Sequence, residues 1–445
     1  MSRKHHNLAG PAGTVDVVVI GAGHSGLATS WLLTGQGISH VVLERGEVAN
    51  AWRERRWESL RLLTPNRQTR LPGFAYEGES PDGFMHAREL VRFLENYAAW
   101  SGAPVLTHAT VNAVRQDGPG YLVTSSRGDW RARAVVLASG ASTVPKVPAL
   151  SRNLPVRITQ LTPLDYRSPA QIEAGGVLIV GASATGAQFA DELARAGHEV
   201  TIATGEHVRM PRRYRGRDIT EWMHSAGISD ERYDEIDDIS RGRRLPSPQL
   251  VGDATRPILD LNSLRDAGVR VAGRLMGVRA GRAQFSGSLR NVCALADLKM
   301  QRLLATLDAH IDAQPGDGSG APVPEQFEAT RVDGSPMLTL DLDAIDTIIW
   351  ATGFKPDFGY LQVPVLDRKG NLQHDGGIVS AAPGLYAMGL PLMRRRKSSF
   401  IAGAEDDARD ITNHLAAYLA ATNKQEYDHG IHQDRSREPV YRRSA

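Results

Sequence analysis

Two segments of this chain repeat the same order of a short apolar strand, a glycine-rich turn and a helix. In the first, the apolar run Thr14–Ile20 leads into GAGHSG at Gly21–Gly26, and the helical stretch that follows is stopped by Gly35 and Gly37. A short, continuously apolar run of this kind is typical of a strand buried on both faces of a parallel sheet. With the strand His40–Leu43 that follows, the segment predicts a βαβ unit.

The second segment repeats this order about one domain length later. Val177–Val180 reads as a buried strand and is followed by GASATG at Gly181–Gly186. An amphipathic helix then ends near Gly197, and the strand Glu199–Ala203 completes the unit. Two such units in 445 residues predict an α/β chain with two Rossmann-like dinucleotide-binding domains.

Each glycine of the first turn has a predicted role. Gly21 permits the tight turn, Gly23 lets a pyrophosphate approach the backbone, and Gly26 lets the helix pack close to the sheet. The positive end of the helix dipole then faces the phosphates. His24 either contacts the ligand or simply starts the helix. Glu44, eighteen positions beyond Gly26, is placed to accept hydrogen bonds from a ribose diol.

The second turn differs from the first at two positions. Ser183 replaces the middle glycine, and Thr204 stands eighteen positions beyond Gly186, where the first unit has an acid. A carboxylate there would repel a 2′-phosphate, whereas guanidinium groups bind it. Four arginines follow: Arg209, Arg212, Arg213 and Arg215. The pattern therefore favours NADP over NAD, unless these arginines merely solvate a loop.

Several further motifs resemble the class B flavin monooxygenases, which include flavin-containing monooxygenases, Baeyer–Villiger enzymes and the plant YUCCA enzymes. The stretch Ala51–Pro65 resembles the one that passes the flavin. ASG at Ala138–Gly140 and ATGF at Ala351–Phe354 resemble crossovers between domains, and LYAMGLP at Leu385–Pro391 resembles the final strand beside the flavin. The resemblance implies FAD and NADPH as cofactors.

By this resemblance the FAD domain is split by an inserted NADPH domain. The expected ranges are 1–155 for the first part of the FAD domain, 156–344 for the NADPH domain, 345–425 for the second part of the FAD domain and 426–445 for a polar tail.

The family identifier FxGxxxHxxx[YW] is mostly absent. The aligned stretch VRITQLTPLDY keeps only Tyr166 and has Val156, Ile158 and Thr162 at the other three marks. Leu63 stands where flavin-containing monooxygenases place an asparagine near the flavin. The chain is therefore expected to be an atypical member.

No catalytic residue is assigned and no metal is expected. For Trp52 and Arg53 the alternatives to a cofactor role are a core position and a surface ion pair, respectively. The residues expected to hold the two cofactors are Gly21, Gly23, His24, Ser25, Gly26, Glu44, Arg45, Trp52, Arg53, Val111, Ala138, Gly181, Ser183, Ala184, Thr185, Gly186, Thr204, Arg212, Arg213, Gly353 and Gly389.

The predicted function is NADPH-dependent insertion of one oxygen atom from O₂ into a small molecule, which in this family proceeds through a flavin C4a-(hydro)peroxide. The alternatives are an NADPH-dependent flavoprotein reductase or oxidase without oxygen insertion, and a nucleotide-binding sensor without activity. Disulfide reduction needs a redox-active cysteine pair, and the chain has one thiol, Cys293.

Composition limits the partners. A net charge of +2 does not imply nucleic acid, so the run RRRK at Arg394–Lys397 is interpreted as a solvated loop. No apolar run is long enough for a membrane span, and the N-terminus lacks the apolar core of a signal peptide, so a cytoplasmic location is expected. A small-molecule substrate and O₂ are the expected partners, and the oligomeric state is not indicated.

Overall fold

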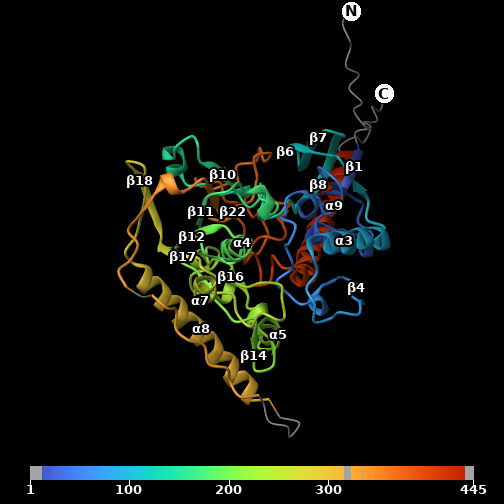
Figure 1. Cartoon of the computed structure of the whole chain (residues 1–445). Coiled ribbons are helices and arrows are strands. Elements are labelled where there is room, and N and C mark those ends of the chain that lie inside the picture. Colours follow the sequence, from blue (N-terminus) through green and yellow to red (C-terminus); the bar gives the residue numbers. More distant parts are fainter. Residues whose placement is uncertain (1–12, 315–321, 333, 436–445) are drawn as a thin grey trace, which may run out of the picture.

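Two sheet-centred units lie side by side in the computed structural model (Figure 1). The structure describes residues 13–314, 322–332 and 334–435, with the side chains of the last helix described as far as residue 422. The first and last parts of the chain build one unit, and the middle of the chain builds the other (Figure 1).

The first unit is built on a mixed sheet with the order β5-β2-β1-β8-β7-β6. Its strands are β1 (Gly13–Ile20), β2 (His40–Leu43), β5 (Val105–Leu106), β6 (Val111–Asp117), β7 (Gly120–Ser125) and β8 (Gly128–Leu137). The pairs β5-β2, β2-β1 and β1-β8 are parallel. The strands β8, β7 and β6 form an antiparallel meander. A late strand, β23 (Leu385–Ala387), pairs in parallel with β8 and returns the chain to this sheet.

The second unit has an entirely parallel sheet with the order β10-β21-β11-β12-β17. Its strands are β10 (Thr159–Leu161), β11 (Gly176–Val180), β12 (Glu199–Thr204), β17 (Arg270–Gly273) and β21 (Thr347–Trp350). All residues of β11 are buried, as expected for a strand covered on both faces. The predicted α/β class with two Rossmann-like units is confirmed.

One strand lies in a different sheet from the one expected. The first unit was expected to resume at residue 345, but β21 lies inside the second sheet, between β10 and β11. Its four residues are fully buried there, so an apolar run of this kind fits the centre of either sheet. The chain returns to the first unit only after β21, through β22 (Phe354–Lys355), which pairs with β9 (Val144–Pro145) of the outgoing crossover.

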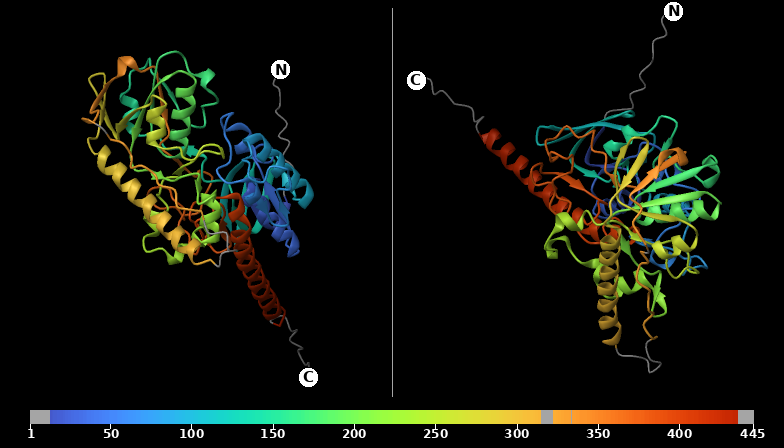
Figure 2. Two further views of the ribbon diagram at one scale, coloured as in Figure 1. Left: turned by 60° about the horizontal axis from the view of Figure 1, so that its bottom comes forward. Right: turned by 60° about the vertical axis from the view of Figure 1, so that its left-hand side comes forward.

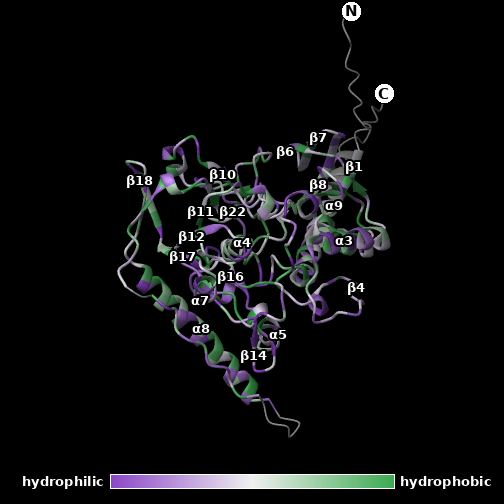
Figure 3. Ribbon diagram, in the orientation of Figure 1, coloured by the Kyte–Doolittle hydropathy of each residue, from purple (hydrophilic) through white to green (hydrophobic). Residues whose placement is uncertain are grey.

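Helices cover both sheets. In the first unit, α1 lies against α3 and α9, and in the second, α4 lies against β11 and β12. The helix α8 extends away from the body (Figures 1 and 2), and apolar and polar residues alternate along it (Figure 3). The helices are α1 (His24–Gly35), α2 (Asn50–Glu54), α3 (Ala87–Ser101), α4 (Ala184–Arg195), α5 (Ile219–Ser225), α6 (Ile239–Gly242), α7 (Leu261–Asp266), α8 (Leu289–Asp312) and α9 (Ala404–Arg435).

Helix α9 continues past residue 425, where a polar tail was expected to begin, and residues 436–445 lie outside the described residues. The remaining short strands are β3 (Arg70–Leu71), β4 (Phe74–Ala75), β13 (Val208–Arg209), β14 (Arg213–Tyr214), β15 (Arg217–Asp218), β16 (Pro248–Gln249), β18 (Leu275–Arg279), β19 (Arg282–Phe285) and β20 (Thr339–Asp341). None of the helices in the described part of the chain combines the length and apolarity required to cross a membrane.

The segment after β2 joins the cores of the two units. Trp57 and Leu60 come from the first part of the chain, yet they are buried in the core of the second unit. Trp52 is partly buried and packs against both cores. The segment therefore fixes how the units sit against one another, because separating them would expose these apolar side chains to water.

The basic run Arg394–Lys397 is an ion-pair cluster, which corrects the expectation of a solvated loop. Arg395 contacts Asp407 and Asp410, each at 2.9 Å or less. Lys397, with its side chain 6% exposed, bridges Asp230 and Asp406. The run therefore ties residues near 230 to the start of α9.

We expect Trp57→Ala to lower the free energy of unfolding by about 3–5 kcal/mol, the usual cost of removing a buried aromatic side chain. The Trp57 ring packs edge-on against Phe189, with 4.8 Å between the ring centroids. Urea-induced unfolding of the purified protein measures the change. Val156→Ala, at a fully exposed position, is the control and should stay within about 0.5 kcal/mol. Equal stability of the two variants would contradict the joined core.

Candidate nucleotide-binding sites

The first glycine turn is tight on two sides and open on one. Gly21 has a φ of +107°, and a Cβ on it would lie 2.5 Å from the carbonyl oxygen of Ala138. A Cβ on Gly26 would lie 1.9 Å from the carbonyl oxygen of Gly21. A Cβ on Gly23 would meet no atom within 4 Å. The open side of Gly23 thus leaves room for a phosphate, which the predicted role of the middle glycine requires.

Polar atoms at the start of α1 have no partner within the described residues. Nε2 of His24 and Oγ of Ser25 are buried without a hydrogen bond, and the helix has no side-chain cap and no acid in its first turn. Buried polar atoms are normally paired, so unpaired ones beside a helix N-terminus fit an anionic ligand. Gly389 lies against this point, because a Cβ on it would come 2.5 Å from Ser25 Oγ.

Glu44 is a buried carboxylate at the end of β2. Its Oε2 accepts a hydrogen bond from the Ala22 amide at 2.8 Å, and its Oε1 accepts one from Gly46 at 3.2 Å. Its carbonyl accepts the Ala109 amide at 2.7 Å, which brings the start of β6 at Val111 near the same strand end. Arg45 beside it is exposed. The position of the Glu44 carboxylate next to the turn fits a ribose diol.

The second turn has nearly the same geometry. Gly181 has a φ of +109°, and its Cβ would lie 2.4 Å from the carbonyl oxygen of Ala351. A Cβ on Gly186 would lie 1.8 Å from the carbonyl oxygen of Gly181. Ser183 is the N-cap of α4 and makes no side-chain capping bond, and α4 begins with Ala184 and Thr185. Gly353, with a φ of +90°, follows in the crossover.

Two features distinguish this second turn. The Ala184 amide is in long contact, 3.4 Å, with the carbonyl oxygen of Ser247, so residues near 247 lie at the start of α4. Thr204, at the end of β12, is fully buried and its Oγ1 has no partner within the described residues. The register pairs Leu43 with Ile20 and Ala203 with Val180, so Thr204 occupies the place of Glu44.

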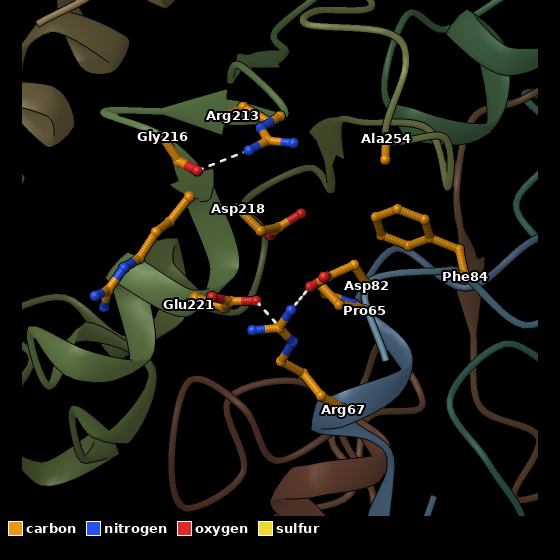
Figure 4. Close-up of a pocket in the computed structure, with 10 residues that line it drawn as sticks. Pro65, Arg67, Asp82, Phe84, Arg213, Gly216, Asp218, Glu221 and Ala254 are labelled. Atoms are coloured by element: carbon orange, nitrogen blue, oxygen red, sulfur yellow. Dashed lines mark hydrogen bonds and ion pairs between the residues drawn. The ribbon is translucent and has the colours of Figure 1, made fainter. Parts of the chain in front are cut away.

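The structure corrects the expectation for Arg212 but not the one for Arg213. Arg212 is 1% exposed, pairs with Asp218 at 2.8 Å and donates to the carbonyl oxygen of Leu63 at 2.8 Å. Its guanidinium therefore stabilises the interior. Arg213 is exposed on β14 and donates to Gly216 O, at the rim of a cavity (Figure 4). Arg213 therefore stays a predicted contact of the 2′-phosphate.

Arg209 and Arg215 are likewise held by carboxylates. Arg209 is buried between Asp260 at 2.6 Å and Asp297 at 2.8 Å. Arg215 pairs with two acids of α8. A buried guanidinium needs such partners to offset its desolvation. Because the acids lie 51 to 97 positions away in sequence, local charge counting could not reveal the pairing.

The stretch expected to pass the flavin has a mixed outcome. Arg53 forms a partly exposed ion pair with Glu95 of α3, so its ion-pair alternative is the one observed. Arg56, which the sequence did not single out, lies 5.0 Å over the Trp52 ring. Burial and the neighbouring Arg55 lower the pKa of Arg56 to about 10, and no ion pair to it is found among the described residues. A partly buried guanidinium without a carboxylate is a candidate ligand contact.

The comparisons with known proteins agree with this geometry. Residues 18–225 match a family model described as pyridine nucleotide-disulphide oxidoreductase. The chain is 28% identical over 407 residues to an uncharacterised CzcO-like oxidoreductase of Geobacillus kaustophilus, covering 90% of this chain and 99% of that protein. It is 29% identical over 204 residues to indole-3-pyruvate monooxygenase YUCCA1 of Oryza sativa subsp. japonica, covering 43% of this chain and 48% of that protein.

A solved structure extends the likeness to nearly the whole chain. A flavin-containing monooxygenase from Stenotrophomonas maltophilia superposes with a TM-score of 0.64 at 21% identity, covering 92% of this chain and 99% of that one. These matches support a likeness to the class B flavin monooxygenase family. The resemblance predicted from its motifs is thereby confirmed, and so is the class of enzyme, a flavin-dependent oxidoreductase.

In this chain the surviving residue of the identifier is a packing residue. Tyr166 is fully buried, its ring centroid lies 4.3 Å from that of Phe189, and its hydroxyl donates to Glu192 at 3.1 Å. Val156, which replaces the phenylalanine, is fully exposed, and Thr162 bonds Asp165. The tyrosine thus anchors the segment after β10 to α4, whereas Ile158 is buried in a separate core cluster.

The single cysteine does not support disulfide chemistry, despite the name of the matching family model. Cys293 is buried in α8, and burial, with Asp297 nearby, raises the pKa of its thiol to about 11. A thiol that stays protonated at neutral pH is a poor nucleophile.

We expect His24 to make stability depend on pH. Burial lowers the pKa of His24 from 6.5 to about 4 in the folded chain, so the unfolded chain binds more protons between these values. The free energy of unfolding should therefore fall as the pH is lowered from about 6.5 towards 4. Urea unfolding at several pH values measures this.

His24→Gln should remove that part of the pH dependence, whereas the exposed His108→Gln should leave it unchanged. If His24→Gln and the parent enzyme lost the same stability over this pH range, a buried neutral imidazole at the turn would be refuted.

Proposed function

We propose that this enzyme uses NADPH and O₂ to insert one oxygen atom into a small molecule. The observation that carries the proposal is the contrast between two otherwise matching sites. The strand beside the first turn ends in Glu44, a carboxylate suited to a free ribose diol, and the strand beside the second ends in the uncharged Thr204. Such a pair fits one nucleotide without and one with a 2′-phosphate.

The cofactors are FAD and NADPH, as predicted, and the family comparisons support both. When bound, FAD accepts a hydride from NADPH and supplies the oxygen chemistry. The chain's own residues bind and orient. The open side of Gly23 and the unpaired atoms of His24 and Ser25 suit the FAD pyrophosphate, and Glu44 suits its ribose.

The partner of the 2′-phosphate is proposed to be Arg274. It directly follows Gly273, which pairs with Thr204 in the register of β12 and β17. Its Cγ and Cδ lie 3.9 Å from the Cβ position of Gly205, the residue after Thr204. The side chain is exposed, and among the described residues its guanidinium has no ion pair. A guanidinium free at this strand end suits a phosphate.

A neighbouring carboxylate is neutralised. Glu206 lies two residues beyond Thr204, where its charge would repel a phosphate. Lys299 of α8 binds it at 2.8 Å, and this hydrogen bond lowers the pKa of Glu206. With Glu206 paired to Lys299, the charge of Arg274 is not offset by this acid.

We expect Arg274→Ala to weaken binding of adenosine 2′,5′-bisphosphate to the FAD-loaded enzyme by about tenfold, because one charge-assisted contact is lost. Binding of 5′-AMP should change by less than about twofold, since it lacks the 2′-phosphate. Isothermal titration calorimetry measures both without requiring turnover.

Arg270→Ala, at an exposed arginine at the other end of the same strand, is the matched control and should behave as the parent. An equal loss for both ligands in Arg274→Ala would contradict the phosphate contact. If Arg213→Ala instead selectively lost binding of adenosine 2′,5′-bisphosphate, Arg213, which the sequence predicted, would be the partner of the 2′-phosphate.

Oxygen insertion itself is tested by rapid mixing of the NADPH-reduced enzyme with oxygenated buffer. A monooxygenase should show an absorbance transient before the oxidised flavin spectrum returns, and should transfer oxygen to product. Immediate return of the oxidised spectrum, with one hydrogen peroxide formed per NADPH, would establish the alternative, an oxidase or reductase without oxygen insertion.

The cytoplasmic location stays a prediction.

A further inference from the structure

A cavity of about 500 Å³ opens between the two units. One side comes from the loop between α2 and α3, and the other comes from β14, β15 and α5 of the second unit (Figure 4). Its lining residues are Pro65, Arg67, Asp82, Phe84, Arg213, Gly216, Arg217, Asp218, Glu221 and Ala254. The volume is ample for a substrate of the size of a substituted aromatic acid.

The carboxylates of this cavity are already paired. Arg67 reaches between Asp82 and Glu221 and contacts both, the latter at 3.4 Å (Figure 4). Asp218 binds the buried Arg212 at 2.8 Å and also accepts the amide of Thr220 at 2.8 Å. Each carboxylate of the lining therefore already contacts an arginine.

Arg213 has no such partner. Its Nη2 donates to the carbonyl oxygen of Gly216 at 2.7 Å, and no ion pair to it is found among the described residues. Figure 4 shows its guanidinium on the opposite side of the cavity from Arg67. A guanidinium has five N–H donors, so most of those on Arg213 remain available. The lining holds three arginines and three carboxylates, and the buried Arg212 behind it, paired with Asp218, adds one more positive charge.

The cavity also has an apolar wall beside the predicted flavin stretch. Pro65 and Phe84 are buried residues of the lining. Arg212 lies 4.9 Å from the Phe84 ring centroid and donates to Leu63 O, two residues before Pro65. The cavity thus continues from the end of the stretch Ala51–Pro65, which resembles the segment that passes the flavin.

We propose that this cavity binds the substrate and that the substrate is a small organic acid, whose carboxylate pairs with Arg213 while its apolar part lies against Phe84 and Pro65. The assignment of the cavity as a substrate site rests on the proposed function. The binding itself follows from the guanidinium of Arg213, which has no ion pair among the described residues, and from the apolar wall beside it, and it is measured separately from turnover.

The test uses the full-length, FAD-loaded oxidised enzyme and a matched pair of probes, phenylacetate and its uncharged analogue phenylacetamide. The parent should bind the acid about tenfold more tightly than the amide, as one charge-assisted guanidinium contact allows. Arg213→Gln should reduce this preference to less than about twofold, and Arg213→Lys should keep part of it. Calorimetric titration gives the dissociation constants.

Arg270→Gln, at an exposed arginine outside the cavity, is the control and should retain the preference. Equal binding of acid and amide, absence of acid binding at ~10 mM, or an unchanged preference in Arg213→Gln would overturn the inference. Selective loss of adenosine 2′,5′-bisphosphate binding in Arg213→Gln would do so too, because the anion would then be the nucleotide phosphate. Failure of NADPH to reduce the flavin would refute the proposed function and leave the probe result valid.

Discussion

The close approach of a helix to the preceding strand at each glycine turn is the constraint on which both nucleotide sites depend. A side chain on Gly26 or Gly186 would lie within 2 Å of a backbone oxygen, so only hydrogen fits there. This contact brings each helix N-terminus over the end of the central strand, where backbone amides and the helix dipole meet an anion. The crossover alanines, Ala138 and Ala351, complete the same packing in both units.

Because the two turns are built alike, discrimination between nucleotides falls to the strand ends beside them. Glu44 is buried and bonded to the backbone of its own turn, which holds the carboxylate in place for a diol. Thr204 offers no charge, and the nearest acid, Glu206, is bound by Lys299. The family identifier plays no visible part in this, since Tyr166, its one retained mark, is a buried packing residue.

The units are held together by side chains that the sequence assigns to the first part of the chain. Trp57 and Leu60 are buried in the core of the second unit. Arg212 of the second unit donates a hydrogen bond to the carbonyl oxygen of Leu63 in the first. A cavity lies between the units, and Arg213 in its lining has no ion pair among the described residues. The proposed acid-binding cavity therefore lies beside the joint between the domains.

Sequence by itself determined the elements whose signals are local. Glycine spacing, apolar runs and the residue at each strand end specify both βαβ units, Glu44 and Thr204, because the backbone geometry of a turn depends on neighbours in the chain. Only the tertiary structure decided which sheet receives β21 and which arginines are free. A buried strand reads the same in either sheet, and ion pairing joins residues far apart in sequence, so neither outcome leaves a local pattern.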